Sequence, residues 1–106
     1  MENEQIIFEI ILHAGNARAE AYEALKSAQN NEFDKSIEFI KNADNEIKIA
    51  HKSQTNMIQR EINGEKVEMS LLFVHAQDHL MTAIAEKSLI ENMINLYKRI
   101  NILENK

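Results

Sequence analysis

The most constraining part of this sequence is SLLFVHAQDHLMTAIA, at residues 70–85. Apolar residues occupy nearly every side of a helix built from it, and such a helix must be buried on several sides. It lies in a predicted helix from about residue 67 to residue 103. Two neighbouring helices of one chain are too few to cover it, so we expect self-association. The alternative is a monomeric bundle with exposed Leu and Ile side chains, which are common on protein surfaces.

Two more helices are predicted before this segment. The first extends from about residue 3 to residue 29, and the second to about residue 62. Their apolar positions recur at helical spacing: Ile6, Ile7, Ile10, Ile11, Ala14, Ala21, Leu25 and Ala28 in the first, and Phe33, Ile37, Ile40, Ala43, Ile47, Ala50, Gln54 and Met57 or Ile58 in the second. The Asn31 side chain is expected to cap the second helix, and Gly64 to allow the left-handed backbone that ends it.

The predicted fold is therefore all-α: an antiparallel three-helix bundle forming one domain over residues 1–106. The absence of proline and the presence of only two glycines favour helices. The net charge of −5, without a basic cluster, makes nucleic acid an unexpected partner. The acidic N-terminus is unlike a secretory signal, and no apolar run reaches the ~20 residues of a membrane span. Without cysteine, the chain fits a reducing compartment, and we expect it in the cytoplasm.

Four polar residues interrupt the apolar seam of the third helix. His75, Asp78, His79 and Thr82 share one helical face, at offsets of three, four and seven residues. Three interpretations remain open from this spacing. His75 could be a nucleophile that forms a covalent phosphoryl intermediate. The two histidines and Asp78 could instead bind zinc or iron. The four residues could also be structural, satisfying each other and fixing the helix register.

Gly15 and Arg18 are two further positions of note in the first predicted helix. Gly15 costs ~1 kcal/mol against Ala in a helix interior, which usually signals close packing or a need for space. Arg18, like most surface arginines, is expected to be a solvated charge.

The sequence resembles the lactose/cellobiose-type IIA family of the phosphotransferase system from about residue 4 to residue 100. The resemblance rests on ILHAGNARAEAYEAL at 11–25, AHKSQTNMIQRE at 50–61 and GEKVEMSLLFVHAQDHLMTAI at 64–84. Two small departures are Asn16, where Asp is also common, and Ala19, where Ser is frequent. Neither departure affects His75.

The resemblance implies a cytoplasmic phosphoryl carrier that assembles as a homotrimeric nine-helix bundle. His75 is then the acceptor, phosphorylated on its Nε2 (tele) nitrogen by phospho-HPr, and it passes the phosphate to a cysteine of the cognate IIB component. Gln77 and His79 are implied as supporting residues. Asp78 is implied to bind one Mg²⁺ per trimer, where three subunits meet. The membrane is reached only indirectly, through the IIC component.

Two questions stay open at this stage. The sugar would be a β-glucoside or a lactose-type disaccharide, but the membrane component selects it, so this chain does not name it. A rival function is that of a trimeric adaptor that keeps the fold without the chemistry. The intact motif around His75 argues against that rival.

Overall fold

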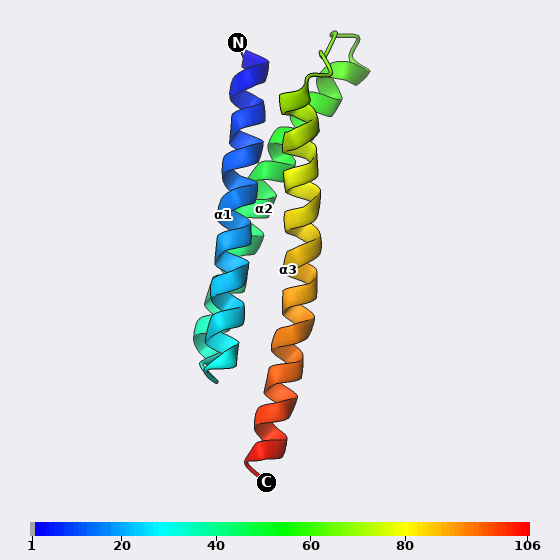
Figure 1. The fold of residues 1–106 in the computed structure, drawn as a ribbon. Coiled ribbons are helices and arrows are strands. Elements are labelled where there is room, and N and C mark those ends of the chain that lie inside the picture. Colours follow the sequence, from blue (N-terminus) through cyan, green and yellow to red (C-terminus); the bar gives the residue numbers. More distant parts are fainter. Residues whose placement is uncertain (1) are drawn as a thin grey trace.

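The computed structural model describes residues 2–106. It consists of three helices: α1 (Glu2–Gln29), α2 (Phe33–Ile62) and α3 (Leu71–Glu104). Figure 1 shows α1 and α3 running in the same direction and α2 running back against them, with α3 extending past the other two. The molecule is a rod with extents of 61 × 21 × 17 Å. The predicted all-α three-helix protomer is confirmed.

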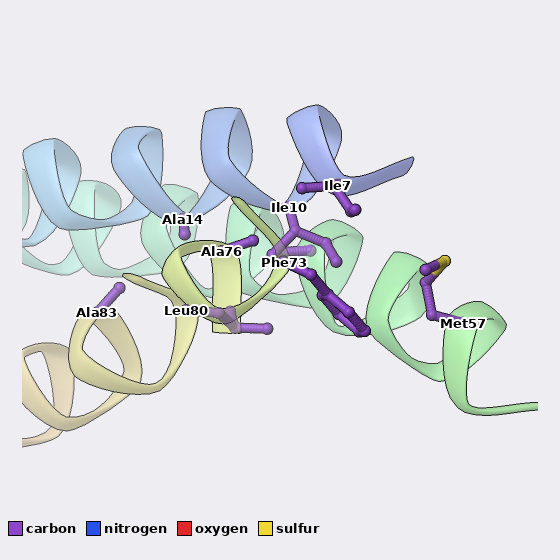
Figure 2. Close-up of a cluster of buried hydrophobic side chains, with 9 residues drawn as sticks. Ile7, Ile10, Ala14, Met57, Phe73, Ala76, Leu80 and Ala83 are labelled. Carbon is purple, nitrogen blue, oxygen red and sulfur yellow. The ribbon is translucent and has the colours of Figure 1, made fainter. Parts of the chain in front are cut away.

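Small residues allow α1 to approach both other helices closely. Its buried face is largely alanine, and the fully buried alanines are Ala14, Ala17, Ala21, Ala24 and Ala28. Larger side chains fill the end of the bundle near the N-terminus, where Ile10 of α1, Met57 of α2 and Leu80 of α3 belong to one buried cluster (Figure 2). This cluster supports the part of α3 that bears the polar block of His75, Asp78, His79 and Thr82.

The first break differs from its prediction. Asn31 does not cap α2, because the residue at the cap position is Glu32, which makes no side-chain hydrogen bond there. Asn31 instead adopts a left-handed backbone with φ of 61°, a conformation that Asn tolerates better than most residues. The second break agrees with its prediction, since Gly64 has a φ of 90° just after the end of α2.

The start of α3 was predicted four residues too early. Residues 65–70 are not helical, and α3 begins at Leu71. The physical reason is Ser70, whose hydroxyl accepts a hydrogen bond from the backbone N–H of Phe73 at 3.1 Å. A serine cap satisfies one of the free N–H groups at a helix start.

The predicted apolar face of α2 was wrong at one turn. Ile37 is 53% exposed, whereas Ser36 beside it is fully buried. Ser36 fits this position because its small side chain allows close approach and its hydroxyl donates to the backbone carbonyl of Ala24 at 2.9 Å. A buried hydroxyl with a partner avoids the cost of desolvation.

One face of α3 keeps a row of apolar side chains uncovered. We call it the α3 stripe, and it consists of Leu71, Leu89, Met93, Leu96 and Ile100, which are 86%, 58%, 42%, 56% and 47% exposed. Within the apolar segment at residues 70–85, Leu71, Val74 and Met81 are 86%, 49% and 56% exposed, so α1 and α2 leave part of it uncovered, as predicted. Among the described residues, no helix is both long and apolar enough to cross a membrane.

Candidate functional site

The polar block lies on the first half of α3. His75, Asp78 and Thr82 are exposed, whereas His79 is partly buried. Because side chains four residues apart stack along a helix, the rings of His75 and His79 lie parallel. Their centroids are 5.9 Å apart and their planes differ by 8°. His75 therefore presents its ring to solvent while resting on a ring that faces the bundle.

Arg18 of α1 connects the polar block to the rest of the protomer. Its Nη1 lies 2.9 Å from Nδ1 of His79, and its Nη2 donates to the Thr82 hydroxyl at 2.5 Å. Its Nε forms an ion pair with the Glu86 carboxylate. The planar guanidinium suits this role because its N–H groups point in fixed directions toward several acceptors at once.

Two further contacts hold this network in place. The Tyr22 hydroxyl donates to the other oxygen of Glu86 at 3.2 Å. This hydrogen bond, together with the negative charge of Glu86, raises the pKa of Tyr22 above its ordinary value. Thr82 donates its own proton to the backbone carbonyl of Asp78 at 2.8 Å, which leaves its oxygen free to accept from Arg18.

The environment of His79 favours its neutral form. Burial lowers the pKa of His79 below its ordinary value, and the positive charge of Arg18 and the neighbouring His75 lower it further. The negative charges of Asp78 and Glu86 act in the opposite direction but do not reverse the shift. Burial and the nearby positive charge thus disfavour the protonated, cationic form of His79.

Gly15 lies directly beside His79. A Cβ atom added at Gly15 would come within 3.4 Å of Nε2 of His79. The sequence had indicated that a mid-helix glycine leaves space for something, and the structure identifies His79 as the side chain next to that space.

Gln77 lies apart from the two stacked histidines. Residues two apart on a helix point to different sides, so Gln77 is directed toward α2 rather than toward the exposed ring. There, Nε2 of Gln54 donates to Oε1 of Gln77 at 2.9 Å. The structure thus brings His79 to His75, while in the protomer Gln77 takes part in packing between α2 and α3.

Metal binding by the polar block of a single protomer finds no support. No group of three or more His, Cys, Asp or Glu side chains within residues 2–106 could hold a metal ion. His79 also has its Nδ1 engaged by Arg18. Asp78 is exposed and contributes a single carboxylate to the surface of the protomer.

The other histidines have structural or surface positions. Nδ1 of His13 lies 2.6 Å from the Glu46 carboxylate, which ties α1 to α2. His51 is exposed and lies 3.3 Å from the hydroxyl of Thr55 on the same helix. Neither histidine lies in the polar block.

Sequence reasoning missed Arg18, Glu86 and Tyr22 as members of the site. Arg18 had been expected to be a solvated charge, but its side chain bonds residues that are 61 to 68 positions away. No local spacing reveals a contact between two distant helices. Gly15 was the one local sign, since it marks the turn of α1 that faces His79.

Known proteins match this chain over most of its length. Residues 5–98 match the family model described as PTS system, Lactose/Cellobiose specific IIA subunit. The lichenan-specific phosphotransferase enzyme IIA component of Bacillus subtilis (strain 168) is 48% identical over 99 residues, covering 93% of this chain and 90% of that protein. The lactose-specific EIIA component of Streptococcus mutans is 46% identical over 92 residues, covering 87% of this chain and 88% of that protein.

Solved structures show the same arrangement of helices. The cellobiose-specific enzyme IIA of Bacillus anthracis superposes with a TM-score of 0.94 at 45% identity, covering 96% of this chain and 94% of that chain. The IIA(Chitobiose) of Escherichia coli, solved in complex with HPr, gives a TM-score of 0.80 at 32% identity, covering 95% of this chain and 98% of that one.

These matches, together with the helical fold and the exposed histidine, define the class of the protein as a phosphoryl carrier with phosphotransferase activity. Within that class, the chain belongs to the lactose/cellobiose-specific IIA family of the phosphotransferase system.

Proposed function

We propose that this chain accepts a phosphoryl group on Nε2 of His75 from phospho-HPr and passes it to a cysteine of a IIB component. The observation that supports this most directly is the exposed ring of His75, stacked on the partly buried ring of His79. A carrier histidine must be reached by two partners in turn, so an exposed ring on a rigid helix suits the task. The IIA(Chitobiose)–HPr complex of a relative at 32% identity supports HPr as the donor.

The transfer involves no change of oxidation state. In the first step, the lone pair of His75 Nε2 forms a new N–P bond, while the N–P bond of the donor histidine breaks and returns its electron pair to that ring. In the second step, a cysteine thiolate forms an S–P bond and the electron pair of the N–P bond returns to His75. Phosphoryl transfer depends mainly on positioning and on donors for the oxygens of the transferred group.

We also propose that three protomers assemble through the α3 stripe. Leu89 and Leu96 are each more than half exposed in the protomer. Covering such a row with a second and third copy of α3 would remove apolar surface from water, which is the main driving force for association. The polar block lies on the same face of α3, between Leu71 and the other residues of the stripe, so Asp78 would lie at the same boundary.

Such an assembly would bring three Asp78 carboxylates together as ligands for one divalent cation. Within residues 2–106 the Asp78 carboxylate has no hydrogen-bond or ion-pair partner, and oxygen ligands are those that Mg²⁺ prefers. Three copies of Asp78 could hold one Mg²⁺ per trimer. The cation would offset the mutual repulsion of the carboxylates, which would otherwise raise one another's pKa.

The sugar is proposed at the level of class, as a β-glucoside or a lactose-type disaccharide. Relatives carry names that refer to lichenan and to lactose. Because the proposed carrier handles only the phosphoryl group, none of its residues has to contact the sugar.

Reconstitution of the relay tests this function. Phosphoenolpyruvate labelled in its phosphate is mixed with enzyme I, HPr, this chain and a IIB component of lactose/cellobiose type. Label should reach the IIB cysteine with the wild-type chain and with the control His51→Gln, and it should not with His75→Gln. Labelling of the IIB cysteine when this chain is left out, or when it carries His75→Gln, would contradict the proposal.

A further inference from the structure

The hydrogen bonds of Arg18 determine where the proton of His79 lies. A guanidinium has N–H donors and no acceptor, so Nη1 of Arg18 can only donate to Nδ1 of His79. Nδ1 must then be the unprotonated nitrogen, and the neutral ring carries its hydrogen on Nε2. The partner of one ring nitrogen thus fixes the state of the other.

The Nε2–H of His79 has no acceptor among the described residues. Its neighbour is the backbone at Gly15, where even a Cβ would leave a separation of 3.4 Å. The same ring stacks in parallel on His75, with centroids 5.9 Å apart. A phosphoryl group on Nε2 of His75 would lie in the plane of that ring, and its tetrahedral oxygens would project out of the plane, including toward the side on which His79 stacks.

We propose that Arg18 is a positioning residue for phosphoryl transfer, which holds His79 as the Nε2–H tautomer so that this N–H donates to the phosphoryl group on His75. The inference rests on the proposed function of His75. Charge spreads over the three equatorial oxygens of the phosphoryl group in the transition state, and a donor already fixed in place stabilises that charge without reorganisation.

The other contacts of Arg18 fix the orientation of its guanidinium. Glu86 binds Nε of Arg18, and Tyr22 holds Glu86 from the opposite side. The Thr82 hydroxyl accepts a hydrogen bond from Nη2 of Arg18. Together with the contacts to His79 and Glu86, this bond holds the guanidinium at three points. Its positive charge is balanced by Glu86, so the polar block gains a neutral donor in a defined direction rather than a mobile cation.

Two substitutions of His79 distinguish its nitrogens. The amide nitrogen of Gln occupies nearly the position of Nε2, whereas the amide of Asn reaches only that of Nδ1. We measure the rate of phosphoryl transfer from phospho-HPr to each variant under single-turnover conditions. His79→Gln should stay within about 3-fold of wild type, and His79→Asn should be slower by roughly 100- to 1,000-fold, as expected for loss of one oxyanion donor. Equal rates for the two variants would overturn the proposal.

A double-mutant cycle tests whether Arg18 acts through His79. Arg18→Met should slow transfer to wild-type His79 by roughly 10-fold. The same change in a His79→Gln background should have little further effect, because an amide has no tautomer to fix. Arg18→Lys should rescue only in part, since Lys cannot bond three acceptors in a plane. The control Arg99→Met removes an exposed arginine of α3 and should leave the rate unchanged. A full Arg18→Met effect in the Gln background would show a merely structural role.

Imidazole ¹⁵N NMR of the wild-type protein gives a test that needs no variant. The spectrum at neutral pH should show His79 protonated on Nε2, and that proton should shift on phosphorylation of His75. A proton on Nδ1 would overturn the inference even if every variant failed to fold. Failure of the proposed function has a different signature, because the wild-type chain would then take no phosphate from HPr at all.

Discussion

The hydroxyl of Ser36 donates a 2.9 Å hydrogen bond to the backbone carbonyl of Ala24, although both residues are fully buried. This bond crosses from α2 to α1 within the alanine-lined contact. It explains why Ser36, rather than the neighbouring Ile37, faces the core of the bundle.

Loss of that bond should lower stability. We expect Ser36→Ala to reduce the free energy of unfolding by about 1 kcal/mol, the usual net contribution of one hydrogen bond. Ser36→Leu should cost more, because extra atoms in a close-packed contact force the helices apart. Urea unfolding followed by circular dichroism measures both changes. Ser88→Ala, at an exposed position of α3, is the control. A neutral Ser36→Leu would show that the contact is loosely packed.

The two glycines should respond oppositely to alanine. Gly15→Ala should raise the free energy of unfolding by about 0.5–1 kcal/mol, since Ala is the better helix former and its Cβ meets nothing closer than 3.4 Å. Gly64→Ala should lower it by about 1 kcal/mol, because its φ of 90° is unfavourable for a residue with a Cβ. Thermal and urea unfolding of the two variants give this comparison.

The stabilised Gly15→Ala protein should nevertheless transfer phosphate more slowly. The added methyl group would occupy the space beside Nε2 of His79, where we expect an oxygen of the phosphoryl group to approach. Single-turnover transfer from phospho-HPr measures the loss. A Gly15→Ala variant that is both more stable and fully active would show that this space is not used.

Because of the contacts of Lys87, we expect the free energy of unfolding to fall in alkaline solution. Lys87 donates to Glu91 on α3 at 2.6 Å and pairs with Asp44 on α2 at 2.7 Å. Burial acts to lower the pKa of Lys87, but the bonds to Asp44 and Glu91 outweigh it and raise the pKa above 10.5. The folded state therefore holds this proton more tightly than the unfolded state does, so the stabilisation is complete below pH 10.5 and is lost as the pH rises through the folded pKa.

Unfolding curves from neutral to strongly alkaline pH measure that loss. Lys87→Met should show a smaller decline than wild type above pH 10.5. Lys35→Met is the matched control, because the pKa of Lys35 is also raised, by Glu32, but its side chain is 66% exposed and its pair lies within one turn of a single helix. Identical curves for wild type and Lys87→Met would mean that the pair contributes nothing.

Assembly should depend on the α3 stripe. Leu96→Glu should dissociate the proposed trimer, because three charges would enter an apolar contact. Ile37→Glu on α2 should leave it intact, although Ile37 at 53% is about as exposed as Leu96 at 56%. Sedimentation velocity reads the oligomeric state. If Leu96→Glu and Ile37→Glu had the same oligomeric state, the α3 stripe would not be the interface.

The same measurement tests the role of Asp78. Asp78→Leu should preserve or strengthen the trimer, since replacing a buried cluster of charges by packed hydrocarbon is often neutral or stabilising. Its assembly should also become independent of a chelator. A monomeric wild-type protein, or an Asp78→Leu protein that dissociates, would contradict the proposed cation site.

The helices could be predicted because their signals are local. Apolar residues at helical spacing, together with Gly64, located α1 and α2 to within a few residues. The start of α3 was misplaced because Val67 and Met69 continue the apolar pattern into a segment that is not helical, and the Ser70 cap was overlooked. Asn31 was assigned to a cap, but its other tendency, the left-handed backbone, is the one observed.

The site was predictable only along α3. His75 and His79 share a helix, so their stacking follows from a four-residue spacing. Arg18 lies on α1 and contacts His79 on α3. The residue spacing within either helix does not reveal this contact, because it depends on how the two helices pack. The exposure of His75 and Asp78 in the protomer also could not be read from the spacing alone.

The central claim is that His75 accepts the phosphate, and intact-mass spectrometry tests it most directly. The chain is incubated with phosphoenolpyruvate, enzyme I and HPr, and its mass is read before and after mild acid, which releases phosphate from histidine. Wild type and His51→Gln should each gain one acid-labile phosphoryl group per chain, and His75→Gln should gain none. An acid-labile phosphoryl group of normal yield on His75→Gln would contradict the account and make His79 the next candidate acceptor.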